Sequence, residues 1–370
     1  MRSLPPTPQK SLNTIQTNVE KKKALIMQTQ IIKINPEKID YKKIKQCADI
    51  LCGGGLVAFP TETVYGLGAL ATDAGAAKKI YAAKGRPSDN PLIIHIAEPS
   101  HAELYAYTCP LYYKLAKAFM PGPLTVILPK KDTIPNEVTG GLSTVAIRCP
   151  AHPIASEIIK AASTAIAAPS ANLSGSPSPT EGIHVINDLN GRIEAIVDGG
   201  SAEIGLESTI VKIDGEALTL LRPGAITRDA LLCVCESVTV AHAVTEALAE
   251  NERPLSPGMK YRHYAPNAPL ILLDGSSENV QAFILKQAKI EKCMMLAYTE
   301  EIPLLEGVST IDIGACEDLQ TQAKRLFSAL RAADAIELDK IYAHLPTQSG
   351  LGLALYNRMI RAAAHTVLKI

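Results

Sequence analysis

Residues able to bind anions and polar ligands gather in five short stretches of the sequence, each next to an apolar run. The first stretch, residues 59–68, reads FPTETVYGLG and follows a run that is typical of a buried strand. Its proline ends the strand, its hydroxyls, Thr61 among them, can point into a crevice, and its two glycines let a ligand approach the backbone. A turn whose hydroxyls cap a following helix explains the stretch equally well.

The second stretch, residues 84–92, carries two cations around a glycine (KGRPSDNPL). Lys84 and Arg86 placed in this way can present a fixed positive fork to phosphate oxygens. The neighbouring prolines and Asn90 favour a shaped loop, so we interpret it as an anion-binding loop rather than as solvated surface charge. His95 follows inside an apolar strand, and by itself it is more typical of a satisfied core histidine than of a ligand-binding one.

The other three stretches each place polar groups at the end of a strand. In the segment TVAIRCP, strand alternation puts Thr144 and Arg148 on one face, and Arg148 must reach an anion or water because burying an unpaired guanidinium is costly. Residues 167–179 combine small residues with hydroxyls and an amide, which suits close recognition of a purine or ribose. A plain connection from a strand to a loop explains them equally well. Residues 207–210 (ESTI) are followed by an Arg-Pro-Gly turn at 222–224, and each piece alone is weak.

Three well-known motifs are absent from the sequence: the phosphate loop G-x-x-x-x-G-K-[S/T], the nucleophile elbow G-x-S-x-G and the zinc motif H-E-x-x-H. Phosphates would therefore have to be held by side-chain cations. The candidates are Lys84, Arg86, Arg148 and Arg222. The sequence also shows no dedicated set of metal ligands.

The composition is that of a globular protein without a global charge bias. Its 37 basic residues balance 37 acidic ones, which disfavours a nucleic-acid coat or a polybasic membrane contact. Trp is absent and only four Phe are present, so stacking of single-stranded nucleic acid would have to rely on Tyr. The eight cysteines lack paired C-x-x-C spacing, which favours reduced thiols. No apolar run of about 18–20 residues and no signal-peptide core is seen, so we expect a cytoplasmic protein.

Alternating strands and helices predict two α/β domains, as the length of 370 residues also suggests. The first is expected to be a mixed sheet with helices, and the second a small Rossmann-like sheet of mainly parallel strands. The expected divisions are a disordered tail (1–28), the first domain (29–240), a linker (241–269) and the second domain (270–370). The last helix is expected near residues 351–367, with Gly350 and Gly352 marking its start rather than a phosphate site.

Together the five stretches resemble those of the YrdC-type family of L-threonylcarbamoyladenylate synthases. The segment SPGMKYRHYAP, residues 256–266, is similar to the linker of the family's long, two-domain members. The likeness runs from about residue 31 to the C-terminus, with the motifs in order. It implies a YrdC-like mixed, twisted sheet with a large, positively charged cavity, where L-threonine, bicarbonate and ATP are joined and pyrophosphate is released.

The resemblance also implies roles for individual residues. The implied contacts of L-threonine are Thr61, His95, Arg148, Ala168 and Ser208. The implied contacts of ATP are Lys84, Arg86, Asn90, Thr144, Ser170, Ser178, Arg222 and Tyr264. No protein nucleophile is expected, because the carbamate of threonine attacks the α-phosphate and the site needs only to position reactants, neutralise charge and exclude water. Mg²⁺ is expected to arrive with ATP and to use few protein ligands.

The product is expected to pass to the tRNA threonylcarbamoyl-transferase machinery, which modifies adenosine 37 of tRNAs that read ANN codons. Within the linker, Tyr261, His263 and Tyr264 are too polar and clustered for a passive tether, so we expect a strap that closes over the nucleotide as a lid. A strap that only fixes the domain interface is the alternative.

Two other functions stay open. A carbamoyl-adenylate-forming enzyme of hydrogenase maturation should carry an acylphosphatase-like segment and paired-cysteine zinc motifs, which this sequence lacks. An RNA-binding module is disfavoured by the zero net charge, and we expect no stable nucleic-acid binding and no membrane contact.

Overall fold

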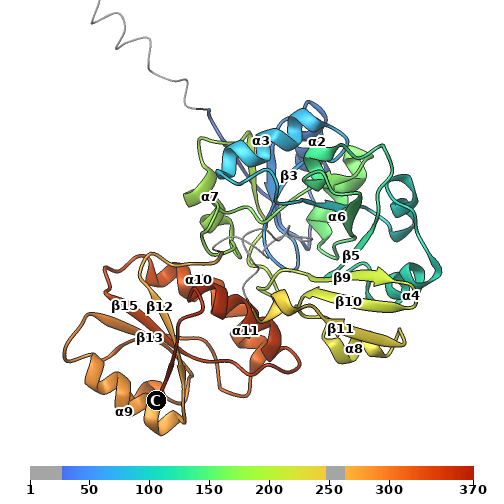
Figure 1. Ribbon diagram of the computed structural model, residues 1–370. Helices are drawn as coiled ribbons and strands as arrows, with labels where there is room; N and C mark the ends of the chain where they lie inside the picture. The colour runs from blue at the N-terminus through green and yellow to red at the C-terminus, as the bar shows by residue number, and fades with distance from the viewer. Residues whose placement is uncertain (1–26, 247–262) are drawn as a thin grey trace, which may run out of the picture.

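The structure is a computed structural model that describes residues 27–246 and 263–370. These residues form two α/β units, the first built on an eleven-stranded sheet and the second on a five-stranded sheet (Figure 1). The α/β class with a second, parallel sheet is therefore confirmed. Residues 1–26 of the expected tail and residues 247–262 of the expected linker lie outside the described residues.

The first sheet mixes parallel and antiparallel pairs in the order β1-β8-β2-β3-β7-β4-β6-β5-β9-β10-β11. Its strands are β1 (Gln30–Lys33), β2 (Val57–Phe59), β3 (Gly66–Leu70), β4 (Ile93–His95), β5 (Leu124–Pro129), β6 (Thr144–Arg148), β7 (Ile166–Ala167), β8 (Ala195–Asp198), β9 (Thr209–Asp214), β10 (Ala217–Arg222) and β11 (Ser237–Val240). Because β4 and β6 are parallel neighbours, the register sets His95 beside Arg148. The sheet thus joins two of the polar stretches directly.

Helices cover both faces of this sheet. Val57 and Phe59 of β2 share a hydrophobic cluster with α2 and α6, whereas Ala58 belongs to the cluster that contains α3, α4 and α7. Alternate residues of a strand point to opposite faces, so the two clusters are the two sides of the sheet. The α-helices of this unit are α2 (Tyr41–Cys52), α3 (Ala74–Lys84), α4 (Pro110–Phe119), α5 (Asn136–Thr139), α6 (Pro153–Ala162), α7 (Gly182–Leu189) and α8 (Arg228–Leu232).

The first polar stretch is a hairpin connection rather than one long loop. Strands β2 and β3 pair antiparallel with Phe59 opposite Gly66, so β3 begins inside the stretch. A Cβ on Gly68 would lie 2.6 Å from the ring of Phe59. This glycine therefore allows close packing inside the hairpin, not the approach of a ligand.

The second sheet is parallel throughout, in the order β14-β13-β15-β12-β16. Its elements are β12 (Leu270–Asp274), α9 (Ser277–Gln287), β13 (Cys293–Ala297), β14 (Ser309–Asp312), α10 (Leu319–Ala333), β15 (Lys340–His344), α11 (Gly352–Ala362) and β16 (Val367–Lys369). Gly350 and Gly352 do mark the start of α11, but the expected end of this helix at residue 367 was wrong. Ala364 and His365 have φ of 47° and 63°, which ends the helix, and the chain then pairs with β12 as an edge strand.

Helices α10 and α11 lie on the side of the second unit that faces the first (Figure 1). Leu353 of α11 belongs to the main hydrophobic cluster of the first unit, while Val64 and Leu206 of the first unit belong to the cluster of the second. Arg331 of α10 also forms an ion pair with Asp188 of α7 at 2.8 Å. The two units therefore share buried surface and are not merely tethered.

Candidate active site

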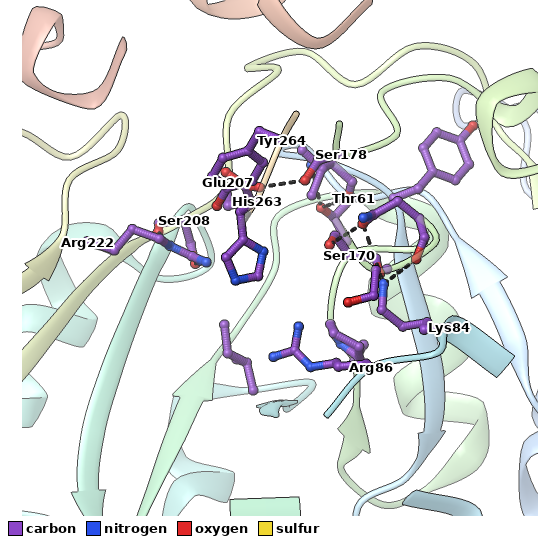
Figure 2. Close-up of a pocket in the computed structure, with 18 of the residues that line it drawn as sticks. Thr61, Lys84, Arg86, Ser170, Ser178, Glu207, Ser208, Arg222, His263 and Tyr264 are labelled. Atoms are coloured by element: carbon purple, nitrogen blue, oxygen red, sulfur yellow. Dashed lines mark hydrogen bonds between the residues drawn. The ribbon is translucent and has the colours of Figure 1, made fainter. Parts of the chain in front are cut away.

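Most of the polar residues singled out in the sequence line one pocket (Figure 2). Those that line it are Thr61, His95, Arg148, Ala168, Ser208, Lys84, Arg86, Ser170, Ser178, Arg222 and Tyr264. Asn90 and Thr144 are not among its lining residues. Asn90 is buried in the adjacent loop, where its backbone carbonyl accepts a hydrogen bond from Arg86 Nη2 at 3.4 Å. Thr144 begins β6, at the opposite end of that strand from Arg148.

The hydroxyl of Thr61 organises the turn between β2 and β3. It accepts hydrogen bonds from the backbone N–H groups of Thr63 and Val64 at 3.2 and 3.3 Å and donates to Val64 O at 2.6 Å. The turn interpretation of this stretch is thus confirmed in part, although no helix follows it directly. Thr61 also lines the pocket, so the residue that shapes the turn lies at the cavity.

Lys84 ends α3, because Gly85 follows it in the left-handed conformation with φ of 63°. Lys84 is 2% exposed, and its side-chain nitrogen donates to the backbone carbonyls of Ser170 and Asn172. Burial, and next the charge of Arg86, holds the pKa of Lys84 well below its ordinary value. The Lys84 side chain thus fixes the loop after β7, and Ser170 of this loop lines the pocket.

Arg148 forms a buried ion pair with Glu62, with 2.7 Å between Nη2 and Oε1. The prediction that Arg148 must reach an anion or water is therefore confirmed, and its partner is the anion Glu62. Burial alone would raise the pKa of Glu62, but the charge and hydrogen bond of Arg148 lower it, so the carboxylate is ionised. Burial, and next the charge of Arg148, lowers the pKa of His95 to about 3, so its imidazole is neutral at pH 7.

Ser208 and Arg222 form a second polar group across the pocket. Arg222 donates from Nε to Ser208 O at 3.0 Å and from Nη2 to Ser208 Oγ at 3.1 Å. The Ser208 hydroxyl also lies 2.7 Å from Thr125 Oγ1 on β5. Burial lowers the pKa of Arg222 to about 10, which still leaves the guanidinium charged at neutral pH.

The described end of the linker reaches the pocket, since both His263 and Tyr264 line it. Tyr264 is 5% exposed, and its ring centroid lies 5.1 Å from that of Phe327 on α10. The N–H of Ala265 donates to Gly175 O at 3.0 Å, which ties this segment to the Ser/Pro loop of the first unit. A lid movement by the linker stays a prediction, because residues 247–262 lie outside the described part of the chain.

Several lining residues were not assigned a role from the sequence. They include Tyr65, Asn172 and Glu207. All three lie within the polar stretches, so their position in the sequence was the available signal. Glu207 stands directly before Ser208, and its carboxylate accepts a hydrogen bond from Ser178 Oγ at 2.6 Å.

Two family models match the chain, one described as "Telomere recombination" (Sua5_yciO_yrdC) over residues 49–224 and one as "Threonylcarbamoyl-AMP synthase, C-terminal domain" over residues 226–364. The threonylcarbamoyl-AMP synthase of Bacillus subtilis (strain 168) is 46% identical over 333 residues, covering 88% of this chain and 94% of that protein. The chain belongs to the threonylcarbamoyl-AMP synthase family. The threonylcarbamoyl-AMP synthase of Pyrococcus abyssi (strain GE5 / Orsay) is 42% identical over 341 residues, which are 90% of this chain and 98% of that protein.

Among solved structures, that of P. abyssi Sua5 complexed with L-threonine has a TM-score of 0.85 to this chain and is 41% identical, covering 92% of this chain and all of that one (100%). Membership of the threonylcarbamoyl-AMP synthase family, in its two-domain Sua5 form, makes the chain an enzyme of the transferase class. It leaves the carbamoyl-adenylate and RNA-binding alternatives without support. Across residues 27–246 and 263–370, no helix has both the length and the apolar character that a membrane crossing needs.

Proposed function

We propose that this chain joins L-threonine, bicarbonate and ATP to give L-threonylcarbamoyl-adenylate and pyrophosphate. The amino group of threonine first adds to bicarbonate with loss of water, which gives a carbamate. A carbamate oxygen then attacks the α-phosphorus of ATP, and the bond to the β-phosphate oxygen breaks as pyrophosphate leaves. The carbamate is the nucleophile, so the chain itself needs to supply only position, charge and shelter from water.

The observation that carries this proposal is the convergence of cations and hydroxyls from distant segments in a single pocket. Lys84, Arg148 and Arg222 come from α3, β6 and β10, and each is less than 10% exposed. Buried positive charge of this kind suits a substrate with a triphosphate and a carboxylate. Relatives with the same two-domain arrangement are threonylcarbamoyl-AMP synthases, which points to the same chemistry.

On the proposed threonine side, Arg148 would bind the carboxylate while Glu62 keeps its guanidinium in a fixed orientation. His95 is neutral and therefore would act as a hydrogen-bonding group rather than as a second cation. Thr61 and Ser208 would contribute hydroxyls to the same ligand. Ala168 is small enough to leave room for the ligand beside the strand.

On the proposed ATP side, Arg86 and Arg222 would contact phosphate oxygens, and Ser170 and Ser178 would supply hydrogen-bonding hydroxyls. Lys84 would act mainly by holding the loop of Ser170, since its ammonium group already bonds to two carbonyls of that loop. Tyr264 would cover the nucleotide from the linker side.

Mg²⁺ is proposed to enter on the phosphates of ATP. The pocket carboxylate Glu207 and the adjacent Glu62 are already paired with Arg358 at 2.8 Å and with Arg148 at 2.7 Å, so their charges are offset within the protein. Residues 27–246 and 263–370 contain no group of three or more His, Cys, Asp and Glu side chains that could hold a metal. Hydroxyl oxygens in the pocket fit a cation whose ligands come mainly from phosphate and water. Such an ion would offset charge on the departing pyrophosphate.

We further propose that the adenylate passes to the tRNA threonylcarbamoyl-transferase machinery in the cytoplasm. An adenylate of a carbamate is prone to hydrolysis, so this product must be used quickly by a following reaction that accepts the threonylcarbamoyl group. The acceptor would be adenosine 37 of tRNAs that read ANN codons.

Incubation with ATP, Mg²⁺, bicarbonate and threonine tests the proposal, with pyrophosphate and a new adenylate as the measured products. We expect threonine and bicarbonate to be needed together. Serine should turn over at least several-fold more slowly, because burial of the threonine methyl contributes ~1 kcal/mol or somewhat more. Pyrophosphate release that does not depend on bicarbonate, or equal turnover of serine, would remove this chemistry.

A further inference from the structure

Helix α11 of the second unit inserts a fully buried arginine beneath the pocket. Arg358 has 0% exposed surface, and its Nε lies 2.8 Å from Glu207 Oε2. Its Nη2 donates to the backbone carbonyl of Glu207 at 3.2 Å, and its Nη1 donates to Pro223 O at 2.7 Å. Arg358 itself is not a lining residue of the pocket, so any effect on substrates must pass through these partners.

The carboxylate of Glu207 connects Arg358 to a pocket hydroxyl. One oxygen, Oε2, pairs with Arg358. The other, Oε1, accepts the hydrogen bond of Ser178 Oγ at 2.6 Å, which Figure 2 shows. Burial on its own would raise the pKa of Glu207, but the charges of Arg358 and Arg222 lower it to about 2. The carboxylate is therefore ionised at neutral pH and can hold Ser178 in one orientation.

The backbone bonds of Arg358 reach both strand ends that carry the Ser208 and Arg222 pair. Glu207 directly precedes Ser208, and Pro223 directly follows Arg222. A guanidinium can serve these separate acceptors at once because its donors form a rigid planar fork, which an ammonium group lacks. A buried ion pair also contributes little to stability compared with apolar packing. We therefore attribute to the Arg358–Glu207 pair the orientation of the groups that it contacts.

We propose that Arg358 is a positioning residue for the nucleotide: through Glu207 it orients the Ser178 hydroxyl, so that the second unit sets the affinity of the pocket for ATP. This inference rests on the proposed function. It assigns to the C-terminal unit an indirect part in substrate binding, through Glu207 and Ser178, which the sequence did not indicate.

Steady-state pyrophosphate release by the full chain tests the proposal with R358K, S178A and the double variant. The lysine keeps the positive charge beside Glu207 but cannot reproduce the fork, so we expect KM for ATP to rise roughly five- to tenfold with kcat changed by less than about threefold. In the S178A background the same R358K change should raise KM by less than about twofold, because the group that it positions is already missing.

The matched control is R325K, since Arg325 of α10 pairs with Asp312 inside the second unit and is half-exposed. It should leave KM for ATP unchanged. If R358K does not fold, as judged by its thermal midpoint, E207Q/R358M replaces it, because this double variant removes both members of the ion pair together and leaves neither of these two charges without the other.

Two results would overturn the inference. The first is a wild-type KM for ATP in R358K or E207Q/R358M. The second is that R358K raises KM for ATP by the same factor whether Ser178 is present or replaced by alanine. The second would mean that Arg358 acts on overall structure and not through Ser178. Failure of the proposed function is distinguishable, since the wild-type chain would then show no pyrophosphate release that depends on threonine and bicarbonate.

Discussion

Replacing Gly205 by alanine tests how closely the loop between β8 and β9 packs on the second unit. Gly205 has φ of +80°, and a Cβ added there would lie 2.5 Å from Lys324 Cα and 2.6 Å from Ala323 O. Both atoms belong to the backbone of α10, so neither can turn aside as the end of a flexible side chain could. The substitution must therefore displace the loop or the helix.

Two costs combine at this position. Holding alanine in the left-handed region costs about 1–2 kcal/mol, and overlap with packed backbone costs about 1–3 kcal/mol more. We expect G205A to lower the free energy of unfolding by about 2–5 kcal/mol. Gly307 is a matched control, because its φ is also +80° but no heavy atom lies within 4 Å of the added Cβ. G307A should therefore cost only about 1–2 kcal/mol.

Urea unfolding of the full chain, followed by far-UV circular dichroism, measures both variants. The N–H of Gly205 donates to Thr63 O at 3.1 Å, so displacement of the loop should also disturb the turn that carries Thr61. We therefore expect G205A, and not G307A, to raise KM for threonine. Equal destabilisation by the two substitutions would refute the close contact between this loop and α10.

Two further predictions concern a buried histidine and the end of the linker. Burial, and next the charge of Arg148, lowers the pKa of His95 from 6.5 to about 3, so its contribution to stability is complete above pH 6.5 and is lost as the pH falls toward 3. H95Q should make the urea midpoint less dependent on pH across this range, and an unchanged dependence would contradict this. If the linker shields the adenylate, Y264A should weaken ATP binding in calorimetry and shorten the lifetime of the adenylate. Wild-type values for both, in a folded protein, would leave the linker as a spacer.

Much of the secondary structure could be predicted because its signals are local. The spacing of apolar residues between positions 41 and 52 is helical and coincides with α2, and the runs at 270–274 and 340–344 are typical of strands and coincide with β12 and β15. A helix or a strand shows its period within one segment, so no distant contact is needed to recognise it. The sequence missed β3, which carries Gly66 and Gly68, and it missed β11. It also extended α11 too far, because β16 exists only through its pairing with β12.

The sequence also indicated which residues would gather at the pocket, since polar stretches at the ends of strands meet when the strands pair. It required a partner for Arg148, because a buried charge without one is costly, but it did not identify Glu62. The sequence could not indicate the partner of Glu207, because Arg358 lies 151 residues away in the chain and belongs to the other unit. Which charges neutralise one another depends on how two folded units pack, and no pattern within one segment encodes that packing; only the tertiary structure decides it.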